Sequence, residues 1–171
     1  MAEQQLTTPR ELLVTQLRQM LGIELRLADE VLPQLADSAH ATELRRGFER
    51  HLLETRAHVE TVRDVLDDLH APAEAEDSAG FRGLVAQHEQ LVARCDGGHT
   101  MTDLAHAVAA LATEHLELAA YESLVSLAES LGEEEIGIRL REVLEQEEFA
   151  LEQVERALAR LLAERVESER Y

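Results

Sequence analysis

Cysteine, proline and aromatic residues are scarce in this chain of 171 residues, and tryptophan, lysine and asparagine are missing. Cys95 is the single cysteine, which excludes a disulfide framework and a thiolate metal site of the rubredoxin or zinc-ribbon kind. Only three prolines and 3% aromatic residues occur, and no run of β-branched residues is present. Because leucine, alanine, glutamate and arginine dominate what remains, the composition predicts an all-α protein.

Positive charge is also in short supply, because 35 acids face 16 bases and the formal net charge is −19. Every base is an arginine. A field of this sign repels phosphate backbones, so we expect no nucleic-acid partner. The same field attracts metal cations, although solubility is the simpler reason for most of the acids.

Long apolar runs are absent as well. No stretch approaches twenty apolar residues, and residues 1–8 hold no apolar signal core. We therefore expect no membrane span and a cytoplasmic location. Apolar residues make up 45% of the chain, so its length suits one domain over residues 1–171 with a sizeable core.

Apolar residues recur at helical spacing in five segments. They predict helices at about 8–37, 41–69, 79–94, 100–131 and 133–166. Thr8 and Glu11 fit a capping box at the start of the first helix. Pro33 lies inside the apolar pattern and should kink that helix near its end.

Two of the connections are short enough to force antiparallel hairpins, around residues 38–40 and around residue 132. Thr100 with Asp103 resembles a capping box for the fourth helix, and Gly132 fits the cap at its end. A longer connection that carries the short helix joins the two hairpins. This predicts a ferritin-like antiparallel four-helix bundle of two hairpins, with an extra short helix in the crossover.

Carboxylates interrupt the apolar stripes of three helices. The residues three, four and seven positions away from Glu24 are all apolar, and so are those around Glu147. Glu114 is nearly the same, with Glu117 as a second acid. A single glutamate in such a stripe usually pairs with an arginine at the rim. Several on separate helices instead favour a shared cation, since unpaired buried carboxylates are costly.

Residues that are equally far from a hairpin turn lie at the same level in antiparallel helices. Glu24 is then level with Glu54 and within a turn of His58, and Glu117 is level with Glu147. Glutamate and histidine on facing bundle helices are the ligands of carboxylate-bridged di-iron and di-manganese sites. We predict two metal ions, with iron favoured over manganese, and six ligands: Glu24, Glu54, His58, Glu114, Glu117 and Glu147.

The pattern departs from the usual Glu-x-x-His motif. Glu54 and His58 are four residues apart, and no histidine follows Glu147 at either spacing. His51 and His115 are interpreted as ordinary interface or surface histidines, either of which could be a spare ligand. Tyr121 is interpreted as core packing, with a hydroxyl that could orient a ligand carboxylate. The remaining histidines receive no role: His40, His70, His88, His99 and His106.

Three segments resemble the YciF-type stress-protein family. They are His-Leu-Leu-Glu-Thr-Arg-Ala-His at 51–58, Glu-His-Leu-Glu-Leu-Ala-Ala-Tyr at 114–121 and Leu-Glu-Gln-Glu-Glu at 144–148. The steps Ile23-Glu24 and Leu32-Pro33 also fit, so that the resemblance covers residues 8–160. It implies a ferritin-like homodimer with a rubrerythrin-like two-metal site on the same six residues, in a bacterial stress response. The chain departs from the family at Leu151-Glu152, where Thr-Asp is common, so position 152 is not assigned as a ligand.

Two functions stay open at this point. The first is a di-metal protein that reacts with peroxide or dioxygen and takes electrons from an external donor. The second is a non-enzymatic helical stress or interaction protein whose acids are paired or protonated. An iron-storage cage is disfavoured because the extra helix lies in the crossover, and a DNA-protecting shell is disfavoured because the termini are not basic.

Overall fold

The computed structural model of the chain describes residues 5–96, 98–168 and 170, and these residues form helices and no strand. The helical segments are α1 (Pro9–Arg26), a π-helical segment (Leu27–Val31), α2 (Leu32–Ser38), α3 (Thr42–Asp68), α4 (Ala79–Val92), α5 (His99–Ser130) and α6 (Glu134–Ser168). Each predicted helix is present, with ends within two residues of the prediction. In the described part of the chain no helix is long and apolar enough to cross a bilayer.

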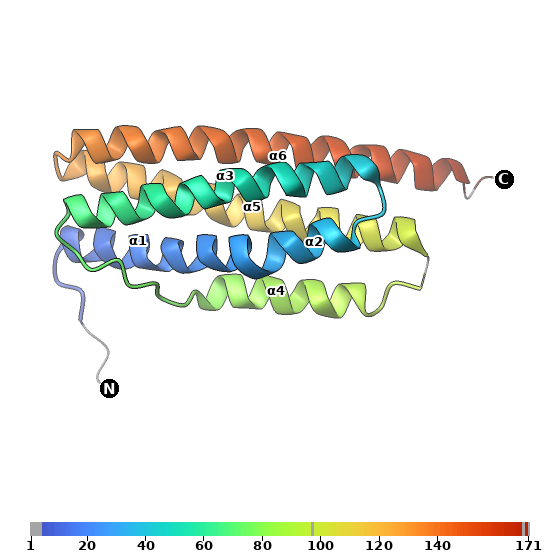
Figure 1. The fold of residues 1–171 in the computed structure, drawn as a ribbon, viewed down its shortest axis with the longest axis horizontal. Helices are drawn as coiled ribbons and strands as arrows, with labels where there is room; N and C mark the ends of the chain where they lie inside the picture. Colours follow the sequence, from blue (N-terminus) through green and yellow to red (C-terminus); the bar gives the residue numbers. More distant parts are fainter. Residues whose placement is uncertain (1–4, 97, 169, 171) are drawn as a thin grey trace.

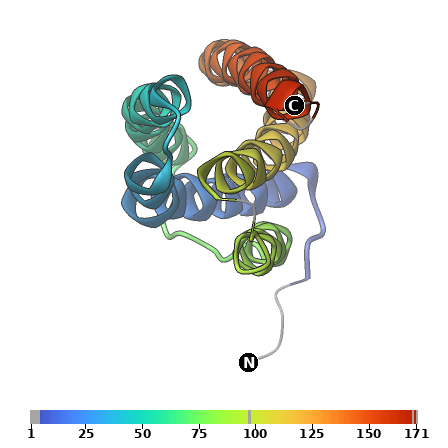
Figure 2. The same cartoon turned by 90° about the vertical axis from the view of Figure 1, so that its right-hand side faces the viewer.

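The helices form a bundle in which α1 with α2, α3, α5 and α6 run lengthwise (Figure 1). The view along the bundle places α4 outside it, where it packs against α5 (Figure 2). The predicted four-helix bundle with a short helix in the crossover is therefore confirmed.

The first long helix begins with the predicted capping box. The Thr8 side chain accepts a hydrogen bond from the Glu11 amide, and the Glu11 side chain accepts one from the Thr8 amide. Where the sequence predicted only a kink at Pro33, the structure has five π-helical residues before it. Pro33 has no N–H, and its ring conflicts with the carbonyl of residue 29 in a regular helix. The wider turn, in which the Leu32 amide bonds to the Leu27 carbonyl, accommodates this proline.

The crossover between α3 and α4 lies directly on α1. The Glu76 amide donates to the Arg18 carbonyl at 2.9 Å, and Arg18 Nε donates to the Pro72 carbonyl at 3.1 Å. Gly22 permits this approach, because a Cβ atom at that position would stand 2.0 Å from the Glu76 carbonyl oxygen. The crossover is thereby fastened along the first helix.

The second hairpin turns at Gly132, as predicted. Gly132 has φ +78°, and the Glu133 amide bonds to the Ala128 carbonyl while the Gly132 amide bonds to the Glu129 carbonyl. This pair of bonds is the Schellman motif. It reverses the chain tightly, so α5 and α6 pack side by side along their length.

The predicted capping box of Thr100 and Asp103 is wrong. The helix α5 begins at His99 after Gly98, and no side chain caps it. The Asp103 carboxylate instead accepts hydrogen bonds from the backbone amides of His40 at 2.8 Å and Ala41 at 2.7 Å. Asp103 therefore supplies the cap of α3, which begins after Ala41 without a side-chain cap of its own.

Candidate metal centre

Buried acids and histidines from all four long helical elements meet in the middle of the bundle. Two groups have ligand atoms that lie within 4.8 Å of one another. We call the first the His51 cluster (His51, Glu114, Glu117, Glu147) and the second the His58 cluster (Glu24, His58, Glu147). Glu147 belongs to both, so the two clusters adjoin.

The His51 cluster joins α3, α5 and α6. His51 Nε2 lies 3.5 Å from Glu114 Oε1 and 3.8 Å from Glu147 Oε2. The other ring nitrogen, Nδ1, contacts Glu54 Oε2 at 3.4 Å, on the outer side of the cluster. His51 thus stands between the buried acids and a carboxylate that is partly exposed.

The His58 cluster joins α1, α3 and α6. His58 Nδ1 lies 2.9 Å from Glu147 Oε1 and 3.6 Å from Glu24 Oε1. His58 Nε2 contacts Gln146 Oε1 at 2.9 Å, which makes this nitrogen the donor and leaves Nδ1 facing the acids. The Tyr121 hydroxyl donates to Glu24 Oε1 at 2.5 Å. These two contacts fix the orientation of the histidine and the carboxylate.

Helical periodicity explains why these side chains converge. On α3, His51, Thr55 and His58 follow one another at spacings of four and three and are all buried. On α5, Glu114, Glu117 and Tyr121 follow one another at spacings of three and four and are also buried. Apolar residues flank both rows along each helix. The polar residues therefore lie on the buried face of each helix and point into the core of the bundle.

Burial changes the acid–base behaviour of the acids. Desolvation raises the pKa of Glu114 to about 8, against the effect of His51. Desolvation also raises the pKa of Glu117 well above its usual value, and the neighbouring Glu147 adds to this. The pKa of Glu24 is raised by the same cause, although His58 opposes it. Burial therefore favours the neutral form of these three carboxyl groups when no cation is present.

The pKa values of the two histidines are also raised, but by neighbouring carboxylates and against the effect of burial. Burial alone would lower the pKa of His58, but the carboxylates of Glu147 and Glu24 outweigh it and raise the pKa to about 11. Burial likewise opposes the charged form of His51, but Glu114 and Glu54 raise its pKa to about 9. Both imidazoles are protonated in the metal-free protein at pH 7, and both must lose a proton to bind a metal.

Eight polar atoms of the two clusters are buried without a hydrogen bond of suitable geometry, although His58 Nδ1 and Glu147 Oε1 lie 2.9 Å apart as an ion pair. They are Oε2 of Glu24, Nε2 of His51, Nδ1 of His58, Oε2 of Glu114 and both carboxylate oxygens of Glu117 and Glu147. Within the described residues, the ion-pair contacts of these acids are with His51 and His58, and none is with an arginine. Carboxylates with imidazole suit divalent iron, manganese or zinc, so the donor set fits two metal ions.

The structure brings five of the six predicted ligands together: Glu24, His58, Glu114, Glu117 and Glu147. Glu54 has the predicted level but lies on the flank of α3, with a side chain 28% exposed, and belongs to neither cluster. Thr55, which is fully buried, takes the inward position at that level. Glu152, which was not assigned as a ligand, is exposed and belongs to neither cluster.

His51 is the residue that the sequence interpretation undervalued, since it was treated as an ordinary histidine. It is 7% exposed and supplies a ligand atom to the four-residue cluster. Its spacing of seven residues from His58 places both on one face of α3. That spacing was the signal available in the sequence.

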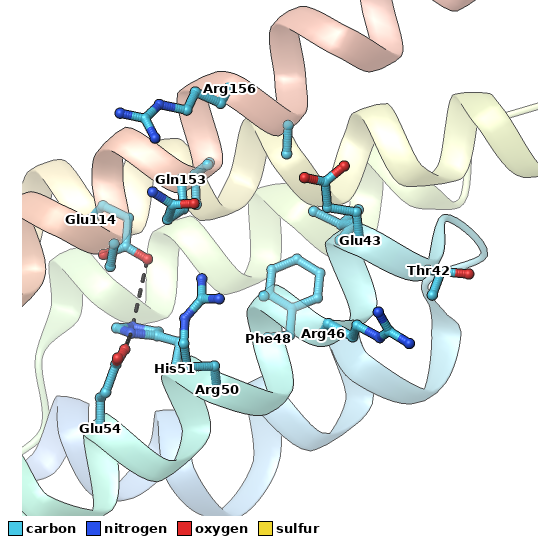
Figure 3. A pocket seen from close by; sticks show the side chains of 15 residues that line it. Thr42, Glu43, Arg46, Phe48, Arg50, His51, Glu54, Glu114, Gln153 and Arg156 are labelled. Atoms are coloured by element: carbon cyan, nitrogen blue, oxygen red, sulfur yellow. Dashed lines mark hydrogen bonds and ion pairs between the residues drawn. The ribbon is translucent and has the colours of Figure 1, made fainter.

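The His51 cluster opens to the surface through a pocket between α3 and α6, with a volume of about 470 Å³. His51, Glu54 and Glu114 line its inner end (Figure 3). Neither Glu24 nor His58 lines this pocket. The two clusters therefore differ in access from outside.

Comparison with known proteins agrees with this fold. The protein YciF of Escherichia coli K12 is 28% identical over 117 residues, which are 68% of this chain and 70% of YciF. The crystal structure of the E. coli stress protein YciF matches with a TM-score of 0.86 at 24% identity, over 92% of this chain and 99% of that one. The structure of YcfI from Rhodopseudomonas palustris matches with a TM-score of 0.85 at 26% identity, over 91% of this chain and 98% of that one.

These matches confirm the YciF-type resemblance and the ferritin-like bundle. The model of a family described as a domain of unknown function, DUF892, matches residues 8–167. That range includes every residue of both clusters. The chain therefore belongs to the DUF892 family.

Proposed function

We propose that this protein is a ferritin-like di-metal protein of a bacterial stress response that reacts with peroxide or dioxygen. Iron is the favoured ion, and manganese is the alternative. The observation that carries the proposal is the set of eight buried polar atoms that lack a hydrogen bond, from residues on four helices. Two divalent cations would offset the charge of roughly four carboxylates and give these atoms partners.

The residues of the two clusters would have different roles in binding the metal ions. Glu147 would bridge the two clusters, while His51 and His58 would each supply a terminal nitrogen. Bound iron would exchange electrons with the oxidant. Reduction of hydrogen peroxide to two waters consumes two electrons and two protons, and we propose that the electrons come from a separate donor protein.

Protons could enter through the His51–Glu54 contact. Glu54 lines the pocket and is partly exposed, and it contacts His51 Nδ1 at 3.4 Å. The hydrogen bond with His51 lowers the pKa of Glu54, so this carboxylate stays ionised and favours the protonated form of the His51 imidazole. The His51 imidazole links it to the buried acids.

Two further parts of the proposal rest on the family resemblance and the charge of the chain. We propose a homodimer in the cytoplasm, to be checked by light scattering and cell fractionation. We also propose that nucleic acids are not partners, because a net charge of −19 disfavours binding to phosphates.

The test is metal retention. The full chain is loaded anaerobically with Fe(II) or Mn(II), desalted and analysed by mass spectrometry for metal content. We expect about two ions per chain, and fewer than one in Glu147→Gln, because that residue serves both clusters. Glu148→Gln is the matched control, since Glu148 is the next residue of α6 and is exposed.

Peroxide turnover by the iron-loaded protein with a chemical reductant is the second measurement. We expect turnover that is lost in Glu147→Gln and kept in Glu148→Gln. If the wild-type chain retains neither metal, the proposal is wrong and the non-enzymatic alternative is favoured, with the acids held by protons.

A further inference from the structure

The pocket beside the His51 cluster is much larger than a peroxide needs. A single water occupies about 30 Å³ of liquid, whereas the pocket measures about 470 Å³. That volume lies in the range of about 300–1,000 Å³ that is usual for small-molecule sites. On α3 the lining runs from Thr42 to Glu54, which corresponds to about 18 Å of helix. The pocket therefore suits an elongated organic molecule.

The walls of the pocket are apolar along most of this length. Leu44 and Phe48 of α3 are buried at its wall, and Ala150, Val154 and Ala157 of α6 face them. Gly47 also lines the pocket, and a Cβ atom at that position would meet nothing within 4 Å. These residues leave room for an alkyl chain between the two helices.

The inner end of the pocket is polar. His51, Glu114 and Gln153 lie there, and His51 Nε2 and Glu114 Oε2 are buried without hydrogen-bond partners. Figure 3 shows Arg50 extending from α3 towards α6 close to His51 and Gln153. The pocket thus has a polar end at the His51 cluster and an apolar remainder.

Charge along the pocket points to an anion. Of the acids that line it, Glu43 pairs with Arg160, and Glu54 and Glu114 contact His51. Arg50 acts on the Glu54 carboxylate through its charge alone. Arg46 and Arg50 both line the pocket and have no hydrogen bond or salt bridge among the described residues. They would attract a carboxylate.

We propose that this pocket binds a medium-chain monocarboxylate, with the carboxylate between Arg50 and the His51 cluster and the alkyl chain along Phe48 and Leu44. Contact of the carboxylate with a metal ion rests on the proposed function. The interactions with Arg50 and with the apolar walls do not. The asymmetric access also means that such a ligand reaches the His51 cluster and not the His58 cluster.

The first experiment is calorimetric titration of the full chain, metal-free and Mn(II)-loaded, with octanoate and with 1-octanol. We expect saturable binding of octanoate, and binding of octanol that is at least about tenfold weaker because the charged hydrogen bonds are lost. Affinity should rise about fourfold per methylene from butanoate to octanoate, since each added group is buried.

Two pairs of variants locate the site. Arg50→Gln should weaken octanoate binding about tenfold, whereas Arg56→Gln, an exposed arginine of α3 outside the pocket, should not. Gly47→Leu should block the pocket, whereas Gly83→Leu on α4 should not. Neither glycine has an atom within 4 Å of an added Cβ, so both variants should fold, which circular dichroism verifies.

Mn(II) supplies a separate readout through proton relaxation of the bound ligand. The methylene next to the carboxylate should relax faster than the terminal methyl group. Octanoate binding to a chain that retains neither Mn(II) nor Fe(II) supports the pocket and contradicts only the proposed function. The inference is wrong if octanoate does not bind either form, if octanol binds equally well, or if Gly47→Leu leaves binding unchanged.

Discussion

Replacing Glu117 by methionine should stabilise the metal-free protein and remove its response to metal. Both carboxylate oxygens of Glu117 are buried without partners, and the side chain is fully buried. An unsatisfied buried polar group costs about 1–3 kcal/mol, and methionine is an unbranched apolar side chain of similar length, so we expect a gain of about 2 kcal/mol. For a chain of this size that corresponds to an increase in Tm of about 4–8 °C.

The wild-type protein, in contrast, should be stabilised by metal. A ligand at 100 times its Kd stabilises a folded protein by about 2.7 kcal/mol, so Mn(II) should raise the Tm of the wild type by a similar number of degrees. Glu117→Met should show little of this increase. Thermal unfolding followed by circular dichroism, with and without Mn(II), measures both effects. Glu122→Met is the control, because Glu122 is an exposed acid of the same helix.

The reasoning would be refuted by a metal-free Glu117→Met protein that melts below the wild type. It would also be refuted by a variant that keeps the full increase with Mn(II). The first outcome would mean that the carboxyl group has partners in the metal-free state. The second would mean that Glu117 is not a ligand.

Three further predictions concern protons and packing. Metal binding at pH 7 should release more than one proton per ion, because Glu114 and the two cluster histidines are protonated without metal. Fewer protons should be released above pH 9. Calorimetric titration in buffers of different ionisation enthalpy measures the number of protons released. Burial and the nearby His88 lower the pKa of His106 to about 4, so the unfolded state binds more protons between pH 6.5 and 4. Unfolding free energy should therefore fall by about 2–3 kcal/mol on acidification through this window, and His106→Gln should lose that part of the slope. Gly22→Ala should destabilise by about 1–3 kcal/mol in urea unfolding, because its Cβ would meet the Glu76 backbone, whereas Gly47→Ala should not.

The sequence predicted the helices and the level of the site well, because hydrophobic periodicity and short turns determine both. It predicted the inward face of α3 less well. Glu54 and Thr55 are neighbours at the same level, but a step of one residue turns a side chain by about 100° around the helix. Glu54 was predicted as a ligand because a carboxylate binds metal ions better than a hydroxyl group does. In the structure, packing places Thr55 on the inward face instead.

Other features depended on contacts between segments that are distant in the sequence. Asp103 looked like the local cap of α5, but it bonds to amides at the start of α3. His51 gained its place in the cluster from acids on α5 and α6. The π-helical segment depends on how Pro33 is accommodated against the rest of the bundle. Local patterns do not contain this information.

The Asp103 cap has a consequence for how the protein is made. The amides of His40 and Ala41 receive their partner from a residue that lies 63 and 62 positions later in the chain, respectively. At a synthesis rate of about 5–20 residues per second, the ribosome extends the chain for several seconds before Asp103 exists. During that time the nascent first hairpin has no fixed start for its second helix. We expect it to become resistant to proteolysis only after α5 has emerged, so that both hairpins mature as one cooperative unit.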